Sequence, residues 1–345
     1  MTLDHRLSAS VAPLPSPRGP LTAYLLDHLQ RPPHPLPPAP VGVDDPLVGD
    51  DSQLALYCCY ELHYRTMAGV GDAWEWDPSL LAFRQRLERA FEDRLRDEVG
   101  PVRRPGDIGP ELHRLIAEGG GPSLSAYARD RADLTQLREL AVHRSAYQLK
   151  EADPHSWALP RLWGPAKSAL VEIQCDEYGQ GVEGQAHAEL WATAMETLGL
   201  DSAYGAYLDL IPGVTLATTN LISLFGLHRR WRGALVGHLA VFEMTSVTPM
   251  SRYAEGLARL GVPPEGRRFY DVHVDADAVH EKVAVARLAG GLAATEPALA
   301  ADIAFGATAL MAIERRFTSV VLDRWADGDT SLLAPLPAVA PCPAG

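Results

Sequence analysis

Hydrophobic residues recur at helical spacing along most of the chain. Between residues 79 and 99, apolar side chains return every three or four positions, and Ser79 and Gly100 stand where such a helix would begin and end. Alternating runs bounded by tight-turn dipeptides, which are typical of strands, are few. The pattern therefore predicts an all-α protein. We expect helices over residues 79–99, 133–153, 166–179, 183–200, 215–231, 233–247, 251–262, 275–290 and 297–328.

The stretch 215–247 is apolar on nearly every face of its two expected helices. A helix with this pattern is typical of the centre of a larger helical assembly. Polar groups inside such a pair need hydrogen-bond or ionic partners. For His238 and Glu243, an internal partner such as Arg229 or Arg232 is one interpretation.

Prolines concentrate at the two ends of the chain. Eleven of the 28 prolines lie in residues 1–50, and RPPHPLPPAP (31–40) is typical of a polyproline linker. We therefore expect residues 1–50 to be a disordered extension and residues 331–345 a disordered tail. Between them, the pattern predicts an N-terminal helical region over 51–132 and a main helical domain over 133–330.

Composition and charge exclude several classes of protein. With 47% hydrophobic and 22% charged residues, the chain is typical of a globular protein. A net charge of -13 and the lack of a long basic cluster argue against a nucleic-acid partner or an anionic membrane surface. We see no apolar run approaching the roughly 20 residues that span a bilayer, no secretory signal and no paired-cysteine metal motif. We therefore expect a cytoplasmic protein without nucleic-acid or membrane partners.

The sharpest chemical signal is FYDVHVDADAVHE (269–281). On a helix, His273, Asp277 and His280 fall within an arc of roughly 60°. Two imidazoles and a carboxylate on one face are typical of a metal site, whereas their acidic neighbours could simply be solvated. A metal site in a helical bundle takes its ligands from several facing helices. Candidate partners are Glu151, Asp153, His155, Glu172, Asp176, Glu177, Glu183, His187 and Glu189.

Two glycines interrupt the most acidic of these segments. Gly179 and Gly181 predict a break in the helix between Glu177 and His187, since glycine weakens helix interiors. A loosened turn there could bring Glu177 beside His187. Glu183 precedes His187 by four residues, which would place both on one helical face. The alternative for this segment is an exposed acidic helix end.

Four segments in this order resemble the iron-containing redox enzyme family, a branch of the haem-oxygenase-like diiron oxidases and oxygenases. The resemblance covers roughly residues 55–330 and implies a haem-oxygenase-like helical bundle that binds non-haem iron, with an additional N-terminal helical region. The segments are LKEADPHSWALPRLWG (149–164), EIQCDEYGQGVEGQAHAELW (172–191), residues 198–246 and FYDVHVDADAVHE (269–281).

The same resemblance implies the ligand set. Some N-oxygenating members have an extra carboxylate three residues before the helical histidine, where this chain has Gly184. The neighbouring Glu183 is therefore the candidate extra ligand, and this departure counts against N-oxygenation. The implied iron ligands are Glu151, Glu177, His187, His273, Asp277 and His280.

The implied function is that of an iron-dependent oxidoreductase. Two Fe(II)/Fe(III) ions and O2 as co-substrate would oxidise a small organic molecule by desaturation, C–C cleavage or N-oxygenation. Asn220, His238 and Glu243 are the candidate pocket residues. The resemblance also leads us to expect a homodimer and an electron donor, and the glycine-containing segment predicts a labile second iron site.

Other interpretations remain open at this point. A cofactor-free or haem-binding member of the same fold would leave the carboxylates unexplained. A ferritin-like bundle would show two Glu-x-x-His motifs, which this chain lacks. The protein could also be a non-catalytic metal-binding or scaffold protein. Glu61, His63 and Arg65 lie outside the implied ligand set, and we expect them to form buried ion pairs between the N-terminal helices and the core.

Overall fold

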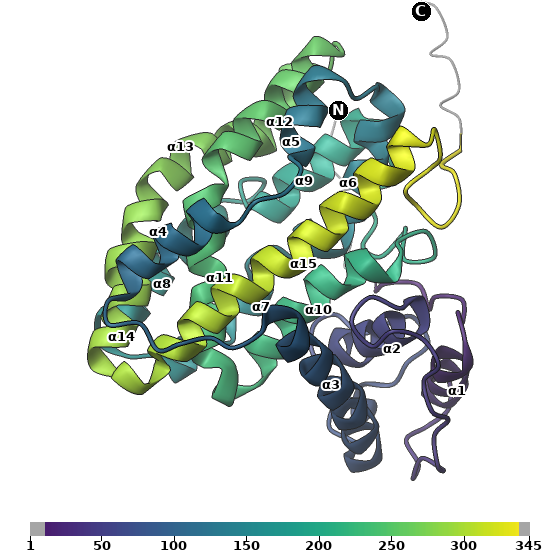
Figure 1. The fold of residues 1–345 in the computed structure, drawn as a ribbon. Helices are drawn as coiled ribbons and strands as arrows, with labels where there is room; N and C mark the ends of the chain where they lie inside the picture. Colours follow the sequence, from purple (N-terminus) through teal and green to yellow (C-terminus); the bar gives the residue numbers. More distant parts are fainter. Residues whose placement is uncertain (1–10, 338–345) are drawn as a thin grey trace, which may run out of the picture.

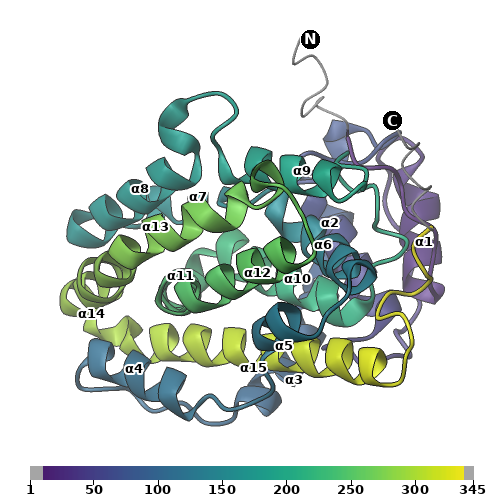
Figure 2. The ribbon, with the colours of Figure 1, turned by 90° about the horizontal axis from the view of Figure 1, so that it is seen from above.

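The protein is a bundle of helices (Figure 1; Figure 2). The computed structural model describes residues 11–337, apart from the side chains of Asp277 and Ala278. Across that range, the only extended pairing is an isolated bridge between Ala12 and Met67, which confirms the all-α prediction. The α-helices described are α1 (Pro20–Leu29), α2 (Asp50–Glu61), α3 (Pro78–Val99), α4 (Ile108–Glu118), α5 (Leu124–Asp130), α6 (Leu134–Gln148), α7 (Asp153–Ser156), α8 (Gly164–Glu177), α9 (His187–Thr197), α10 (Gly213–Leu227), α11 (Arg232–Thr245), α12 (Val247–Arg259), α13 (Arg268–Lys282), α14 (Gly290–Thr295) and α15 (Ala300–Ala326).

Helices α10 and α11 lie at the centre of the bundle, and α15 packs along α11. Nearly every residue of α10 and most of α11 are buried, as their apolar patterns predict. The contact between α11 and α15 is a backbone contact. A Cβ on Gly237 would collide with the carbonyl oxygen of Ile303, and one on Gly306 would collide with that of Ala234. Glycine at both positions therefore lets the two helices approach this closely.

The expectation that no apolar segment approaches the length needed to span a bilayer was wrong for the region of α15. Together with the turn before it, the segment Pro297–Ala326 is long and apolar enough to cross a bilayer by length and composition. In the structure, however, 61% of its most apolar window is buried within the protein. It packs against α10, α11, α3 and α4. An apolar helix covered by other helices on this scale is typical of a bundle core.

The chain folds well before residue 51, which corrects the expected disordered extension. Helix α1 packs on α2, and the carboxylate of Asp51 accepts hydrogen bonds from the backbone N–H groups of Leu21 and Thr22, both at 2.8 Å. Asp51 thus satisfies two of the unpaired donors that every helix N-terminus carries. The proline-rich stretch 31–40 itself is neither helix nor strand, as expected. The many prolines on either side led to the short amphipathic helix α1 being missed, because it lies between two irregular proline-rich segments.

The C-terminal tail also begins later than expected. The backbone N–H and hydroxyl of Ser331 donate to Glu139 Oε2 at 2.9 and 2.6 Å, and Leu332 is buried. Ser331 and Leu332 are therefore held against the helical core, and residues 338–345 lie outside the described part of the chain.

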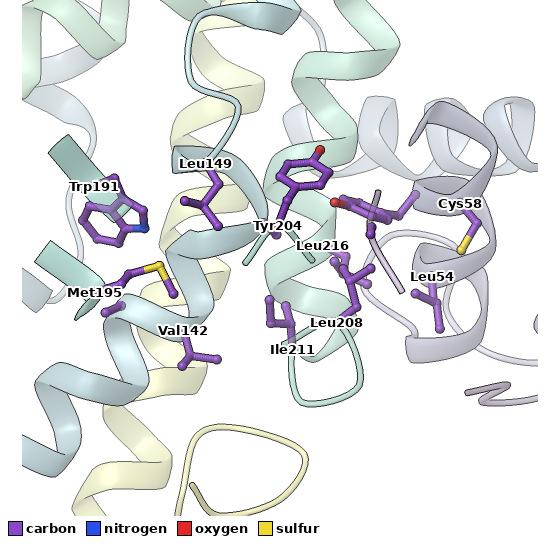
Figure 3. Close-up of a cluster of buried hydrophobic side chains, with 14 of the residues drawn as sticks. Leu54, Cys58, Val142, Leu149, Trp191, Met195, Tyr204, Leu208, Ile211 and Leu216 are labelled. Carbon is purple, nitrogen blue, oxygen red and sulfur yellow. The ribbon is translucent and has the colours of Figure 1, made fainter. Parts of the chain in front are cut away.

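A hydrophobic cluster joins the N-terminal region to the main domain (Figure 3). It crosses the expected boundary between residues 132 and 133 without a break. The side chains come from α2, α6 and its C-terminal end, α9, the irregular segment 198–212 and α10: Leu54, Cys58, Val142, Leu149, Trp191, Met195, Tyr204, Leu208, Ile211 and Leu216.

Several helix boundaries differ from the predicted ones, and three of these differences lie near the candidate site. Helix α6 ends at Gln148, so that Glu151 falls on a turn before α7 rather than on a helix. Ala152 on this turn has φ 72°, an uncommon conformation for a residue with a side chain. Helix α9 begins only at His187, and α13 begins at Arg268 and continues through a π-helix (Val283–Ala289) into α14.

Candidate metal centre

Six acidic and histidine side chains meet between five segments of the bundle. The turn after α6 supplies one carboxylate, the last residue of α8 and the first residue of α9 supply a carboxylate and an imidazole, α11 supplies a carboxylate, and α13 supplies two imidazoles. All except the half-buried Glu151 are buried. The residues are Glu151, Glu177, His187, Glu243, His273 and His280.

The first group comprises Glu151, Glu177, His187 and His273. One potential ligand atom of each lies within 4.8 Å of the others. The Nδ1 atom of His273 donates to the carbonyl oxygen of Phe269 at 2.7 Å. That bond selects the tautomer whose Nε2 carries the lone pair, which is the form that binds a metal. The same Nε2 lies 3.7 Å from Glu151 Oε1.

The second group comprises Glu177, Glu243 and His280, whose potential ligand atoms also lie within 4.8 Å of one another. His280 Nδ1 is 3.3 Å from Glu243 Oε2, and its Nε2 contacts Asp176 Oδ2 at 2.7 Å. A carboxylate on the far nitrogen of a histidine commonly orients the ring toward a metal. Glu177 belongs to both groups, so the two share one carboxylate.

The donor set fits a bound cation. Glu177 Oε2 and His187 Nδ1 are buried 3.0 Å apart, yet neither meets hydrogen-bond geometry with the other or with any other described atom. Glu151 Oε2 is likewise buried without a hydrogen bond. Buried polar atoms in proteins are rarely left without a hydrogen-bond partner. A cation between these atoms would satisfy all three, and histidine with carboxylate is a donor set that suits iron.

The pKa values of Glu177 and Glu151 are shifted in opposite directions. Burial alone would raise the pKa of Glu177, but the adjacent His187, His273 and His280 lower it to about 2. Burial raises the pKa of Glu151, and His273 only partly opposes this. Two carboxylates in one buried site repel each other when both are ionised. A divalent cation would remove that repulsion and keep both carboxylates charged.

The turn between Glu177 and His187 depends on glycine. Gly179 has φ 60°, and a Cβ there would overlap the backbone of Ala186. Glycine alone adopts this conformation without strain. The chain therefore reverses direction here, and the predicted helix break brings Glu177 beside His187.

Three of the predicted residues lie away from the cluster or outside what can be described. Glu183 is exposed on the loop before α9, so the expected shared helical face with His187 does not exist. Asn220 donates to the backbone and side-chain oxygens of Gln53, both at 2.8 Å, which makes it a link between α2 and α10 rather than a pocket residue. The side chain of Asp277 lies outside the described residues, although its backbone is part of α13.

His238 and Glu243 have different surroundings from those expected. Neither pairs with the two arginines proposed from the sequence; Arg232 binds Glu296 instead. His238 lies behind the cavity wall beside Phe242, with ring centroids 4.7 Å apart, and both of its nitrogens are buried without a hydrogen bond. Glu243, predicted only as a pocket residue, faces His280. The sequence signal for Glu243 is that it is the one carboxylate on a helix that is mostly apolar.

A cavity of about 390 Å³ leads to the cluster. Glu151, Glu177, Glu243 and His273 line its inner part. Its outer part lies between the segment 119–125 and the side chains of α12 and α15. This volume suits a small organic molecule.

The predicted structural role of Glu61 is confirmed. Glu61 Oε2 forms an ion pair with Lys150 Nζ at 2.7 Å, and both side chains are fully buried. Tyr204 donates to the other carboxylate oxygen at 2.7 Å. His63 contacts Glu75, and Arg65 donates to the carbonyl oxygen of Leu149. The contacts of Glu61 and Arg65 join the N-terminal helices to the turn that carries Glu151. The expected ion pairs to the core were wrong for the other two residues: His63 pairs within the N-terminal region, and Arg65 binds a carbonyl oxygen rather than a carboxylate.

Comparisons with known proteins agree with this geometry. The profile of a family described as iron-containing redox enzyme matches residues 138–315. A nitrosourea synthase from Streptomyces achromogenes subsp. streptozoticus is 30% identical over 111 residues, which make up 32% of this chain and 23% of that protein. The match thus spans less than a quarter of that relative.

Solved structures show the same fold. Two structures of a CADD-like protein of unknown function from Nostoc punctiforme each align with a TM-score of 0.50, at 18% and 16% identity. The alignments cover 63% and 65% of this chain and 96% of the other. The family profile covers just over half of the chain and includes all six residues of the metal cluster. The chain therefore belongs to the iron-containing redox enzyme family.

Proposed function

We propose that this protein is a non-haem diiron oxidoreductase that uses O2 to oxidise a small organic substrate. The observation that carries the proposal is the position of Glu177. It contributes to two groups of potential ligands at once, which is the arrangement expected of a carboxylate that bridges two metal ions. Membership of an iron-containing redox family supports iron as the metal.

The residues divide between two ion positions. Glu151, His187 and His273 would hold one ion, Glu243 and His280 the other, and Glu177 would serve both. The resemblance adds Asp277 to this set. Asp176 would keep the His280 ring oriented through its contact at Nε2. When bound, two iron ions supply the electron transfer to O2 that amino-acid side chains do not provide.

The protein contributes enclosure and positioning. The cavity places a small substrate against the inner carboxylates while α11 and the aromatic pair Tyr147 and Phe242 shield it from water. Tyr147 and Phe242 stack with an interplanar angle of 2°. Desaturation, C–C cleavage and N-oxygenation are the outcomes within the proposal. A cytoplasmic homodimer supplied by an electron donor is the setting that we propose for it.

Iron stoichiometry tests the shared carboxylate. Anaerobic titration with Fe(II) should give two ions per chain for the unaltered protein. Glu151→Gln and Glu243→Gln should each weaken the binding of one ion, whereas Glu177→Gln should weaken the binding of both. Glu183→Gln is the matched control, since that glutamate is exposed and should leave both ions bound. Equal iron binding by all four variants would contradict the assignment.

Oxygen consumption tests the redox role. The protein loaded with Fe(II) should consume O2 at a rate that rises when a suitable substrate is added, and Glu177→Gln should abolish the effect. Two bound ions with no O2 consumption under any substrate would instead favour a non-catalytic metal-binding protein.

A further inference from the structure

The cavity wall beside the metal cluster carries three buried polar side chains that the proposed metal centre does not use. They are Gln148, His155 and Gln174, all more than nine-tenths buried. Each has at least one polar atom without a hydrogen bond: Gln148 Oε1, His155 Nε2 and Gln174 Oε1. Unsatisfied buried groups are costly, and several on one cavity wall indicate a ligand that satisfies them.

The orientation of the Gln174 amide is fixed by its neighbours. Its Nε2 donates to the carbonyl oxygen of Ala152 at 2.9 Å and lies 2.7 Å from Ser156 Oγ. A carbonyl oxygen can only accept, so the nitrogen must face it and Oε1 must face the cavity. The group that binds Oε1 must therefore be a donor, N–H or O–H.

The other two side chains can accept hydrogen bonds as well. Burial lowers the pKa of His155 to about 4, so that the ring is neutral at pH 7 and keeps a lone pair on one nitrogen. Gln148 Oε1 is buried and makes no hydrogen bond to any described residue. Three acceptors on one wall can be served together by a group with several donors, which a primary amine has and an alcohol lacks.

The Gln174 amide excludes a carboxylate head group at this wall. A carboxylate has no proton to donate to Gln174 Oε1, and its own oxygens would repel that oxygen. Two arginines line the cavity, and Arg315 is exposed to solvent. The less exposed Arg144 is already engaged by Glu314 through two bonds of 2.8 and 2.7 Å. Its guanidinium fork is thus filled and offers little to a substrate anion.

We propose that the cavity binds a small primary amine, whose nitrogen donates hydrogen bonds to Gln148, His155 and Gln174. This inference rests on the proposed function, because it names the substrate class of the same site. Gln148 precedes Glu151 by three residues, and Gln174 precedes Glu177 by three on one face of α8. The amine nitrogen therefore sits about one helical turn, roughly 5 Å, from the carboxylates of the metal cluster. The body of the amine would lie against Tyr147, Leu239 and Phe242.

Calorimetric titration of three matched ligands tests the substrate class. The protein is loaded with Zn(II), which is redox-inert, and titrated with hexylamine, hexan-1-ol and hexanoate. Hexylamine should bind at least about tenfold more tightly than the other two, which corresponds to one net hydrogen bond to a charged group. Equal or tighter binding of hexan-1-ol or hexanoate would overturn the proposal.

Variants test the named residues. Gln148→Leu and Gln174→Leu should each weaken hexylamine binding by about tenfold. Gln148→Leu should also raise the melting temperature, because it removes an unsatisfied buried amide; a merely structural glutamine would lower it. Gln53→Leu is the matched control, since this buried glutamine is bonded to Asn220 far from the cavity wall and should leave amine binding unchanged. Unchanged binding in both cavity variants would refute the assignment.

The design separates this inference from the proposed function. If Zn(II) fails to bind, the metal centre is contradicted, and the hexylamine titrations are repeated on the metal-free protein. The same dependence on the two glutamines there would still support an amine site, and its absence would overturn it.

Discussion

The buried ion pair between Glu61 and Lys150 gives a sharp test of how the N-terminal helices support the site. Both side chains are fully buried, and their charged atoms lie 2.7 Å apart. The Lys150 ammonium also lies over the rings of Tyr57 and Tyr64, at 4.7 and 4.3 Å from their centroids. Lys150→Met removes the cation but leaves the volume almost unchanged.

The expected effect on stability is large. Removing one partner of a buried pair leaves an uncompensated buried charge, which costs about 3–5 kcal/mol. Solvent screening does not reduce this figure, since neither side chain reaches the surface. Against a typical unfolding free energy of 5–15 kcal/mol, the loss is about a third. The double variant Glu61→Leu/Lys150→Met removes both charges and should recover most of it, less about 1 kcal/mol for the hydrogen bond that Tyr204 loses.

Urea denaturation of the two single variants and the double variant measures the coupling between the two residues. Because Lys150 adjoins Glu151 on the turn after α6, Lys150→Met should also weaken iron binding, by about tenfold. Arg114→Met, on an exposed residue that pairs only along its own helix, is the matched control and should change the unfolding free energy little. A loss below about 1 kcal/mol in Lys150→Met would refute the reasoning, as would additive effects in the cycle.

Three further predictions concern buried histidines and the glycine turn. His238→Phe should raise the unfolding free energy by about 1–2 kcal/mol, since it replaces two unbonded buried nitrogens with a ring among aromatic neighbours; a lower midpoint in urea would contradict this. Burial lowers the pKa of His143 to about 3 and of His155 to about 4, so the unfolded chain takes up these protons at a higher pH than the folded protein does. The stability that comes from burying each neutral ring is therefore complete above about pH 6.5 and is lost as the pH falls toward those values. Unfolding free energies measured from pH 7 to 4 should therefore fall by up to about 1.4 kcal/mol per pH unit for each histidine, and His143→Gln should reduce the slope. Gly179→Ala should lower iron binding by displacing Glu177, whereas Gly181→Ala, where a Cβ meets open space, should do so less; equal iron affinities in the two would count against the close-contact argument.

The sequence predicts the fold and much of the cluster for identifiable reasons. Periodic apolar positions reveal long helices, and the spacing of His273 and His280 places both on one face of α13. The paired glycines reveal the break beside Glu177. The spacing rule failed for Glu183, because it assumes a helix that begins before His187, whereas α9 begins at that residue.

Other features depend on contacts that spacing does not encode. Glu243 reaches His280 only because α11 packs against α13, and periodicity shows which face of a helix is apolar but not which helix covers it. Glu151 lies on a turn made by a positive φ at Ala152, where no glycine signals a change of direction. Helix α1 was missed because its signal is short, and its stability comes from Asp51 on another helix.

The glycine turn places Glu177 and His187 at helix ends whose partial charges have the same sign as the charges that these two side chains can carry. Glu177 is the last residue of α8, where the backbone carbonyls make the helix end negative, and His187 is the first residue of α9, where the end is positive. An anion at the first position and a protonated imidazole at the second are each unfavourable by about 0.3–1 kcal/mol. A cation beside Glu177 reverses the sign at the end of α8. Metal binding and local folding of residues 178–186 are therefore thermodynamically linked, and amide hydrogen exchange in that segment should slow when metal is added.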